Sequence, residues 1–126
     1  MEIKKIPDGE LEIMQVLWEK SYPMTATEIC ENLNKESSSL LATTAKLLSR
    51  LSDRGFVSNE KKGNLKYYIA LVGEDEYLSV ENRSFLERVN HNSIRKFLVS
   101  LAQTKDITED DIEALREFIR EKEEKS

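Results

Sequence analysis

The sequence is poor in the residues that build catalytic and metal sites. It has one cysteine, one histidine and four glycines in 126 residues. A single cysteine, Cys30, excludes an intrachain disulfide and a thiolate metal cluster, and its place on the apolar side of an expected helix predicts a packed thiol. His91 has no Cys, Asp or Glu at ligand spacing, and so few glycines leave no phosphate-binding loop or nucleophile elbow. We therefore expect no enzyme activity, no metal and no cofactor.

Long apolar segments are missing as well. No run approaches the roughly 20 residues of a membrane span, and the N-terminus lacks the apolar segment of a secretory signal. With 39% hydrophobic and 34% charged residues, the composition is typical of a soluble protein with one domain or two small ones. We expect a cytoplasmic location and no membrane partner.

The net charge of −5 is unevenly distributed along the chain. Residues 1–72 carry ten Lys/Arg and ten Asp/Glu, whereas residues 73–126 carry nine against fourteen and supply the whole −5. Residues 38–72 contain six basic and two acidic residues, which gives this segment a local charge of +4. This asymmetry favours a first half that faces an anion such as DNA and a second half with another task.

A helix is expected over residues 39–54, just before Gly55, the residue type most often found past a helix C-terminus. One side of it repeats apolar residues at helical spacing and should face a core. That side comprises Leu40, Leu41, Thr44, Leu47, Leu48 and Leu51. The opposite side is polar, which is typical of a helix lying between a core and a solvent or DNA surface.

A basic hairpin is expected directly after this helix. Residues 56–60 and 66–70 have β-like composition, and Gly63-Asn64 between them indicates a tight turn. A helix that ends at glycine and runs into a basic hairpin has the form of a recognition helix followed by a wing, here residues 56–70. For the helix alone, an ordinary solvated face is the alternative.

The polar side of the helix and the hairpin together form a candidate DNA site. A helix that enters a DNA groove needs short hydrogen-bonding side chains near its start and cations farther along to meet phosphates. Lysines on a wing can lie along the backbone of the flanking DNA. The predicted DNA-binding residues are Ser39, Ala42, Thr43, Lys46, Arg50, Lys61, Lys62, Asn64 and Lys66.

Two helices are expected before the recognition helix. Asp8 is placed to cap the first, whose broad apolar face includes Trp18. Thr25 and Glu28 match the capping-box pattern at the start of the second, which should bury Ile29, Cys30 and Leu33. Helix, short helix, turn, longer helix and hairpin is the order of a winged helix-turn-helix.

Residues 73–126 read as three amphipathic helices, with Thr108 capping the last. About fifty residues bury too little surface to be stable alone, so pairing with a second copy is the preferred interpretation, and packing onto the first half is the alternative. The predicted dimer interface comprises Phe85, Leu86, Phe97, Leu98, Leu101, Leu115 and Ile119. The predicted fold is mainly α with a small β-hairpin wing, divided into a DNA-binding domain (1–72) and a three-helix dimerisation domain (73–126).

The run from Gly9 to Trp18 resembles the opening of the penicillinase repressor, methicillin-resistance repressor and copper-operon repressor family. Further matches span nearly the whole chain and comprise residues 47–51, Gly55, residues 61–63, Tyr68, Tyr77 and residues 83–86. The resemblance implies a homodimeric winged-helix repressor whose N-terminal domains bind a palindromic operator and whose C-terminal helices form the dimer.

Some positions depart from the family pattern. The recognition helix of the family usually begins Trp-Ser-Pro-Lys-Thr, whereas residues 39–43 are Ser-Leu-Leu-Ala-Thr, so only Thr43 carries over. Penicillinase-type members are inactivated by cleavage at an Asn-Phe bond, where this chain has Ser100-Leu101, and the C-terminal cysteine motif of copper-type members is missing. The resemblance therefore implies neither induction route.

Taken together, these patterns predict a homodimeric transcriptional repressor that binds a palindromic double-stranded DNA operator through helix 39–54 and wing 56–70. A winged-helix module for protein–protein contacts, without sequence-specific DNA binding, is the alternative. Salt dependence separates the two, because phosphate contacts release counterions.

Overall fold

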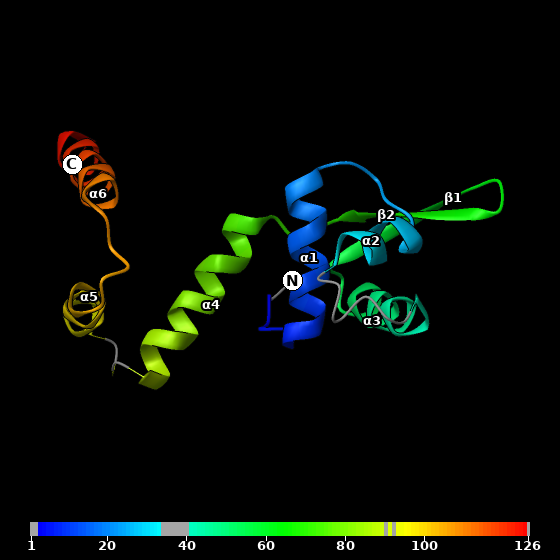
Figure 1. Cartoon of the computed structure of the whole chain (residues 1–126), viewed down its shortest axis with the longest axis horizontal. Coiled ribbons are helices and arrows are strands. Elements are labelled where there is room, and N and C mark those ends of the chain that lie inside the picture. Colours follow the sequence, from blue (N-terminus) through cyan, green and yellow to red (C-terminus); the bar gives the residue numbers. More distant parts are fainter. Residues whose placement is uncertain (1–2, 34–40, 90, 92, 126) are drawn as a thin grey trace. The chain divides into compact units, whose positions relative to one another are not determined.

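The computed structural model describes residues 3–33, 41–89, 91 and 93–125 (Figure 1). The described residues form six helices and one antiparallel hairpin. These elements are α1 (Asp8–Lys20), α2 (Ala26–Asn32), α3 (Leu41–Asp53), β1 (Val57–Lys62), β2 (Leu65–Ala70), α4 (Glu74–Val89), α5 (Ile94–Gln103) and α6 (Glu109–Lys125). The predicted fold, mainly α with a β-hairpin wing, is confirmed. No helix in the described part is long and apolar enough to cross a membrane.

The chain divides into two compact units, Met1–Glu81 and Asn82–Ser126. The division falls within α4, after Glu81 rather than after residue 72, so the first turns of α4 belong to the first unit. The assignment of one unit to DNA and the other to dimerisation stays a prediction.

The first unit is built around an apolar core to which every one of its elements contributes. Apolar residues of α1 recur at helical spacing and place one side of the helix inward. The fully buried apolar side chains are Ile13, Met14, Met24, Ile29, Leu48, Leu51 and Tyr77. Burying each such large side chain contributes about 1.5–3 kcal/mol, so this core positions α3 and the hairpin firmly.

The first two helices of the first unit start differently, because α2 has a side-chain cap and α1 has none. Thr25 Oγ1 accepts a hydrogen bond from the Glu28 amide (3.2 Å), and Glu28 Oε1 accepts one from the Thr25 amide (2.9 Å), which confirms the predicted capping box. The prediction that Asp8 caps α1 is wrong. Pro7 occupies the N-cap in an extended conformation, and Asp8 is the first helical residue, where its charge still favours the positive end of the helix dipole.

Tyr77 ties the start of α4 into the core of the first unit. Its side chain is fully buried, and its ring lies 5.9 Å from those of Trp18 and Phe56. The hydroxyl accepts a hydrogen bond from the Ile6 amide (2.9 Å) and donates one to Glu81 Oε1 (2.8 Å). The hydroxyl thereby pairs a buried amide that would otherwise lack a partner.

The Tyr77 hydroxyl should make the stability of the first unit sensitive to alkaline pH. Burial, opposed by the Ile6 amide and assisted by Glu81, raises the pKa of Tyr77 to about 12, whereas an unfolded tyrosine titrates near about 10. The stabilisation of the first unit by the neutral hydroxyl is therefore complete below about pH 10 and is lost as the pH rises through about 12. Between these values the wild type should lose about 2 kcal/mol more than Tyr77→Phe.

Urea unfolding of both proteins at several pH values measures this difference. At neutral pH, Tyr77→Phe should already be about 1–3 kcal/mol less stable, because the buried Ile6 amide loses its acceptor. Parallel pH profiles for the two proteins would show that the hydroxyl does not control the alkaline transition.

The second unit has well-defined helix starts but no buried core of its own. Ser93 Oγ accepts from the Lys96 amide at the start of α5 (3.1 Å). Thr108 and Asp111 bond each other's backbone at the start of α6, which confirms the predicted Thr108 cap. Phe85 and Phe97 meet edge to face at 5.6 Å, yet no described residue from 82 onward is buried.

Candidate nucleic-acid interface

α3 is anchored by one apolar side that packs against α1 and α2. Thr44, Leu48 and Leu51 are buried, and Leu47 is half-buried, as predicted. Leu41 departs from the prediction, because it is 48% exposed in the first described turn of the helix. The predicted core residue Leu40 and the predicted DNA contact Ser39 lie outside the described residues.

The end of α3 is set by Gly55. The Phe56 amide donates to the Leu51 carbonyl (2.9 Å) and the Gly55 amide to that of Ser52 (3.1 Å), which is the Schellman arrangement. Gly55 has a φ of 80°, a left-handed conformation that costs glycine little. Phe56, buried beside Leu51 in the same core, turns the chain directly from α3 into β1.

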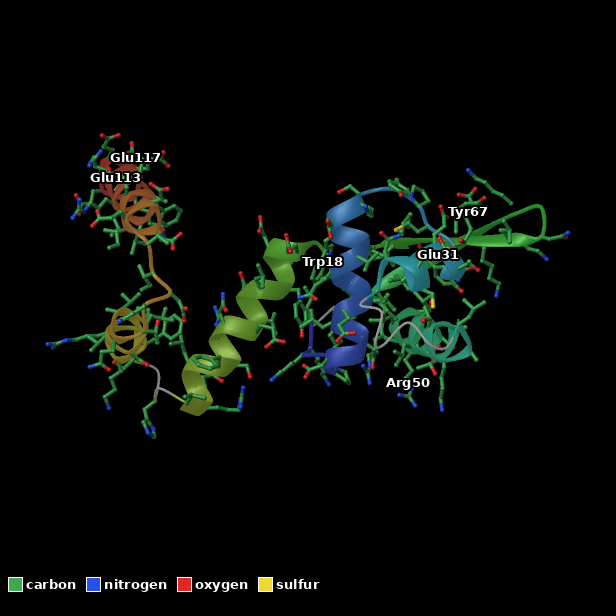
Figure 2. The ribbon with its side chains drawn as sticks, viewed as in Figure 1. Trp18, Glu31, Arg50, Tyr67, Glu113 and Glu117 are labelled. Atoms are coloured by element: carbon green, nitrogen blue, oxygen red, sulfur yellow. The ribbon has the colours of Figure 1, made fainter. Side chains whose placement is uncertain are left out.

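The outer side of α3 carries the predicted contact residues together. Ala42, Thr43, Lys46 and Arg50 are all exposed, and residues three and seven positions after Thr43 lie on its side of the helix. Figure 2 shows Arg50 extending away from the ribbon of α3. Within the described part of the chain, Lys46 and Arg50 make no hydrogen bond or ion pair. Both cations are therefore available to an external anion.

The hairpin has a two-residue turn and a fixed register. Gly63 has a φ of 64°, and Asn64 has no positive φ, which is the pattern of a type II′ turn with glycine first. Lys61 pairs with Lys66 and Lys62 with Leu65, so both strands run closer to the turn than predicted. Met24 adds a single antiparallel bridge to Tyr68, with N–O distances of 2.7 and 3.1 Å.

The register separates the three wing lysines onto two faces. Side chains alternate along a strand, so Lys61 and Lys66 share the face on which Val57 and Ala70 meet the core. Lys62 lies on the other face, with its Nζ 5.9 Å from the centre of the Tyr67 ring. Like charges directly opposite each other are destabilising, and a bound phosphate would relieve the repulsion between Lys61 and Lys66.

Arg54, one of the basic residues counted in the local charge of +4, is paired within the fold. Its Nη1 lies 2.5 Å from Oε1 of Glu10, which is fully buried on α1. The second oxygen of Glu10 is buried and has no hydrogen-bond partner among the described residues. This pair links α1 to the residue that follows α3, and Arg54 therefore holds the end of α3 in place instead of adding to the free basic surface.

The predicted dimer residues lie on α4, α5 and α6 of the second unit. Leu98, Leu115 and Ile119 are 44–48% exposed, while Leu86, Phe97 and Leu101 are half-buried. The predicted set leaves out apolar residues that are more than half exposed, among them Val89 (51%), Ile94 (60%), Val99 (51%) and Phe118 (56%). Phe118 lies three positions after Leu115, a spacing that could have indicated it.

A short helix packed on a longer one, with a two-stranded hairpin directly after it, defines the first unit as a winged helix-turn-helix. The family model of the penicillinase repressors matches residues 6–121. The chain belongs to the penicillinase repressor family.

Two curated relatives and one solved structure show the extent of the similarity. The chain is 28% identical over 122 residues to a penicillinase repressor of Bacillus licheniformis, covering 94% of each chain. It is 25% identical over 118 residues to the methicillin resistance regulatory protein MecI of Staphylococcus aureus, covering 94% of this chain and 95% of the relative. The solution structure of the DNA-binding domain of the repressor BlaI matches with a TM-score of 0.52 and 32% identity, over 60% of this chain and 92% of that one.

Proposed function

We propose that this protein is a cytoplasmic DNA-binding transcriptional repressor that contacts DNA through α3 and the wing. The observation that carries the proposal is the pair of cations Lys46 and Arg50 on the outer side of α3, which make no hydrogen bond or ion pair in the described part of the chain. The domain that holds them is similar in sequence and fold to the DNA-binding domain of BlaI. A helix anchored by leucines on one side, with free cations on the other, suits a DNA groove.

The residues of α3 divide into two roles in this proposal. Thr43 lies near the start of the helix and offers a short hydroxyl for a base edge, and Ala42 beside it is small enough for close approach. Lys46 and Arg50, one and two turns farther on, meet phosphates and fix the position of the helix. Ser39, which lies outside the described residues, keeps its predicted role as a DNA contact.

The wing supplies a second set of phosphate contacts. Lys61 and Lys66 stand opposite each other on the core-side face, and we infer that they bind the DNA backbone together, with Asn64 at the turn. Lys62 points to the other face, where the Tyr67 ring attracts its charge. Lys62 is therefore a weaker contact than the other two lysines.

Charge reversal should distinguish the two faces of the wing. Lys61→Glu should lower affinity for specific and non-specific duplex DNA alike and reduce the slope of log K against log salt by about one or more relative to the wild type. Lys62→Glu, which makes the same change one residue away, is the matched control with a smaller effect. Fluorescence anisotropy with labelled duplexes measures all three proteins, and equal losses for Lys61→Glu and Lys62→Glu would refute the separation of faces.

We further propose that the protein is a homodimer that reads a palindromic operator. The described part of the second unit has no buried residue, and its half-exposed apolar side chains would each contribute about 1 kcal/mol if a partner covered them. The proposed interface keeps the residues predicted from the sequence, from Phe85 to Ile119. Two recognition helices held by such a dimer can bind two half-sites about one or more helical turns apart.

Salt dependence tests the proposed function against the alternative of a protein-interaction module. The affinity of the full chain for duplex DNA should fall by about a thousand-fold or more when salt rises from about 50 to 200 mM, because phosphate contacts release counterions. A protein-interaction module would show no measurable DNA binding at the lower salt concentration. That result would overturn the proposal.

A further inference from the structure

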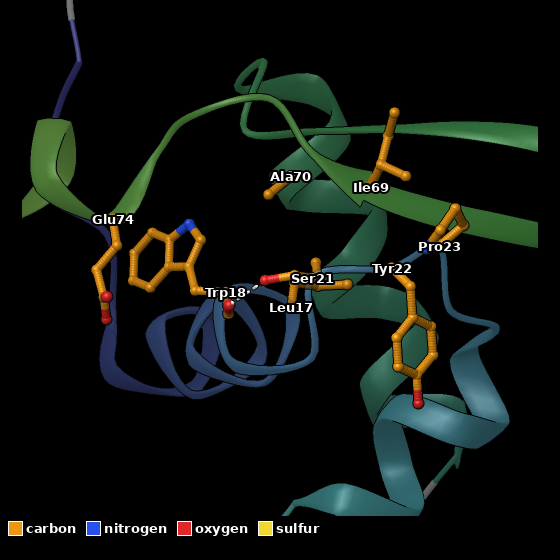
Figure 3. Close-up of a pocket in the computed structure, with 8 residues that line it drawn as sticks. All are labelled: Leu17, Trp18, Ser21, Tyr22, Pro23, Ile69, Ala70 and Glu74. Atoms are coloured by element: carbon orange, nitrogen blue, oxygen red, sulfur yellow. Dashed lines mark hydrogen bonds between the residues drawn. The ribbon is translucent and has the colours of Figure 1, made fainter.

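A pocket of about 340 Å³ opens in the first unit, away from the outer side of α3 (Figure 3). Its walls come from the end of α1, the connection to α2, strand β2 and the first residue of α4. The residues that line it include Trp18, Tyr22, Ala70 and Glu74. The volume lies within the range of about 300–1,000 Å³ that is usual for small-ligand sites.

One wall of the pocket is aromatic and rigidly held. Trp18 Nε1 donates a hydrogen bond to the Val72 carbonyl (2.9 Å), and the indole lies 5.9 Å from the buried Tyr77 ring. These contacts use the polar edge of the indole and fix its orientation. Tyr22, half exposed at 50%, supplies a second ring on the connection between α1 and α2.

The charge at the rim of this pocket is negative. Glu74 and Trp18 both line the pocket (Figure 3). Within the described residues, Glu74 makes no hydrogen bond or ion pair, and no lysine or arginine lines the pocket. Asp75 and Glu76 follow Glu74 in the first turn of α4. Aromatic faces attract cations, and quaternary ammonium groups are recognised in this way.

We propose that this pocket is a binding site for a small organic monocation with an apolar body, such as a quaternary ammonium compound. The cationic head lies between the Trp18 ring and the Glu74 carboxylate, and the apolar part lies against Ala70. Because Ala70 belongs to β2, the ligand contacts the base of the wing. The proposal goes beyond DNA binding and uses none of the proposed DNA contacts, so either one can fail without the other.

Trp18 is the only tryptophan in the chain, so intrinsic fluorescence reports on this pocket directly. The experiment titrates the full-length protein, without DNA, with choline and with the uncharged analogue in which carbon replaces its nitrogen. Choline should give a saturable fluorescence change, and the analogue should bind about five-fold more weakly. Amide NMR shifts of Ser21 and Ala70 provide a second reading of the same site.

Two neighbouring variants test the role of the carboxylate. Glu74→Gln should weaken choline binding about five-fold, whereas Asp75→Asn, which removes the same charge outside the pocket, should leave it unchanged. Glu74 is exposed, so the fold should tolerate this substitution. The proposal is overturned if neither signal saturates with choline, if choline and its analogue bind equally, or if the two variants behave alike.

Discussion

Replacing both Lys46 and Arg50 by alanine should weaken binding to duplex DNA by about 100-fold. Both side chains project from the outer side of α3 without a partner among the described residues, and a charge-assisted contact to a phosphate is worth about 1.5 kcal/mol or more. Because phosphate contacts are independent of sequence, the loss should be similar on all duplexes. The slope of log K against log salt should fall by about two.

Anisotropy titrations of the double variant need a control with the same change in charge. Lys20→Ala combined with Lys105→Ala removes two exposed cations outside the proposed interface and should change affinity little. Thr43→Ala should instead relax sequence preference while keeping the salt slope, since a base-edge contact releases no counterion. Unchanged DNA binding by the Lys46/Arg50 variant would refute the assignment of α3 as recognition helix.

A Leu98→Asp substitution should dissociate the dimer and reduce operator affinity by about 100-fold or more. Leu98 is 44% exposed on α5 in the single chain. An aspartate there would bury an unpaired carboxylate in the proposed interface, which costs several kcal/mol. A monomer has only one recognition helix, so it lacks the second set of phosphate contacts and binds the operator more weakly.

Sedimentation velocity compares the wild type, Leu98→Asp and Ser100→Asp. Ser100, also exposed on α5, lies two residues away on the other side of the helix, and its variant should stay dimeric. A chain ending at Val89 should be a monomer that folds and binds a half-site weakly. This chain keeps Tyr77 and Glu81 of the first unit, whereas a cut after residue 72 would remove both. A wild type that sediments as a monomer at micromolar concentration would rule the dimer out.

Those features whose causes are local in the sequence could be predicted from it. The Thr25–Glu28 capping box, the Thr108 cap and the stop of α3 before Gly55 each depend on residues within one or two turns of one another. Helical spacing likewise indicated which side of α3 is buried. For the candidate site, this spacing placed Thr43, Lys46 and Arg50 on one exposed side.

Features that depend on distant partners could not be predicted in this way. Glu10 bonds to Arg54 and Tyr77 to the Ile6 amide, and periodicity does not identify such partners. The opposition of Lys61 and Lys66 depends on how far the strands pair toward the turn, whereas the sequence predicts strand segments only over residues 56–60 and 66–70. Leu41 shows a further limit of predicting burial from helical spacing, because an apolar residue in the first turn of a helix can extend past the core.

Selection of bound sequences from a random duplex library tests the central claim most directly. The full-length wild-type protein is used at moderate salt, and the enriched duplexes are sequenced. A dimeric winged-helix repressor should enrich an inverted repeat whose half-sites are centred about 10 base pairs or a multiple of that apart. Enrichment of a single unpaired half-site, or no enrichment at all, would contradict the account.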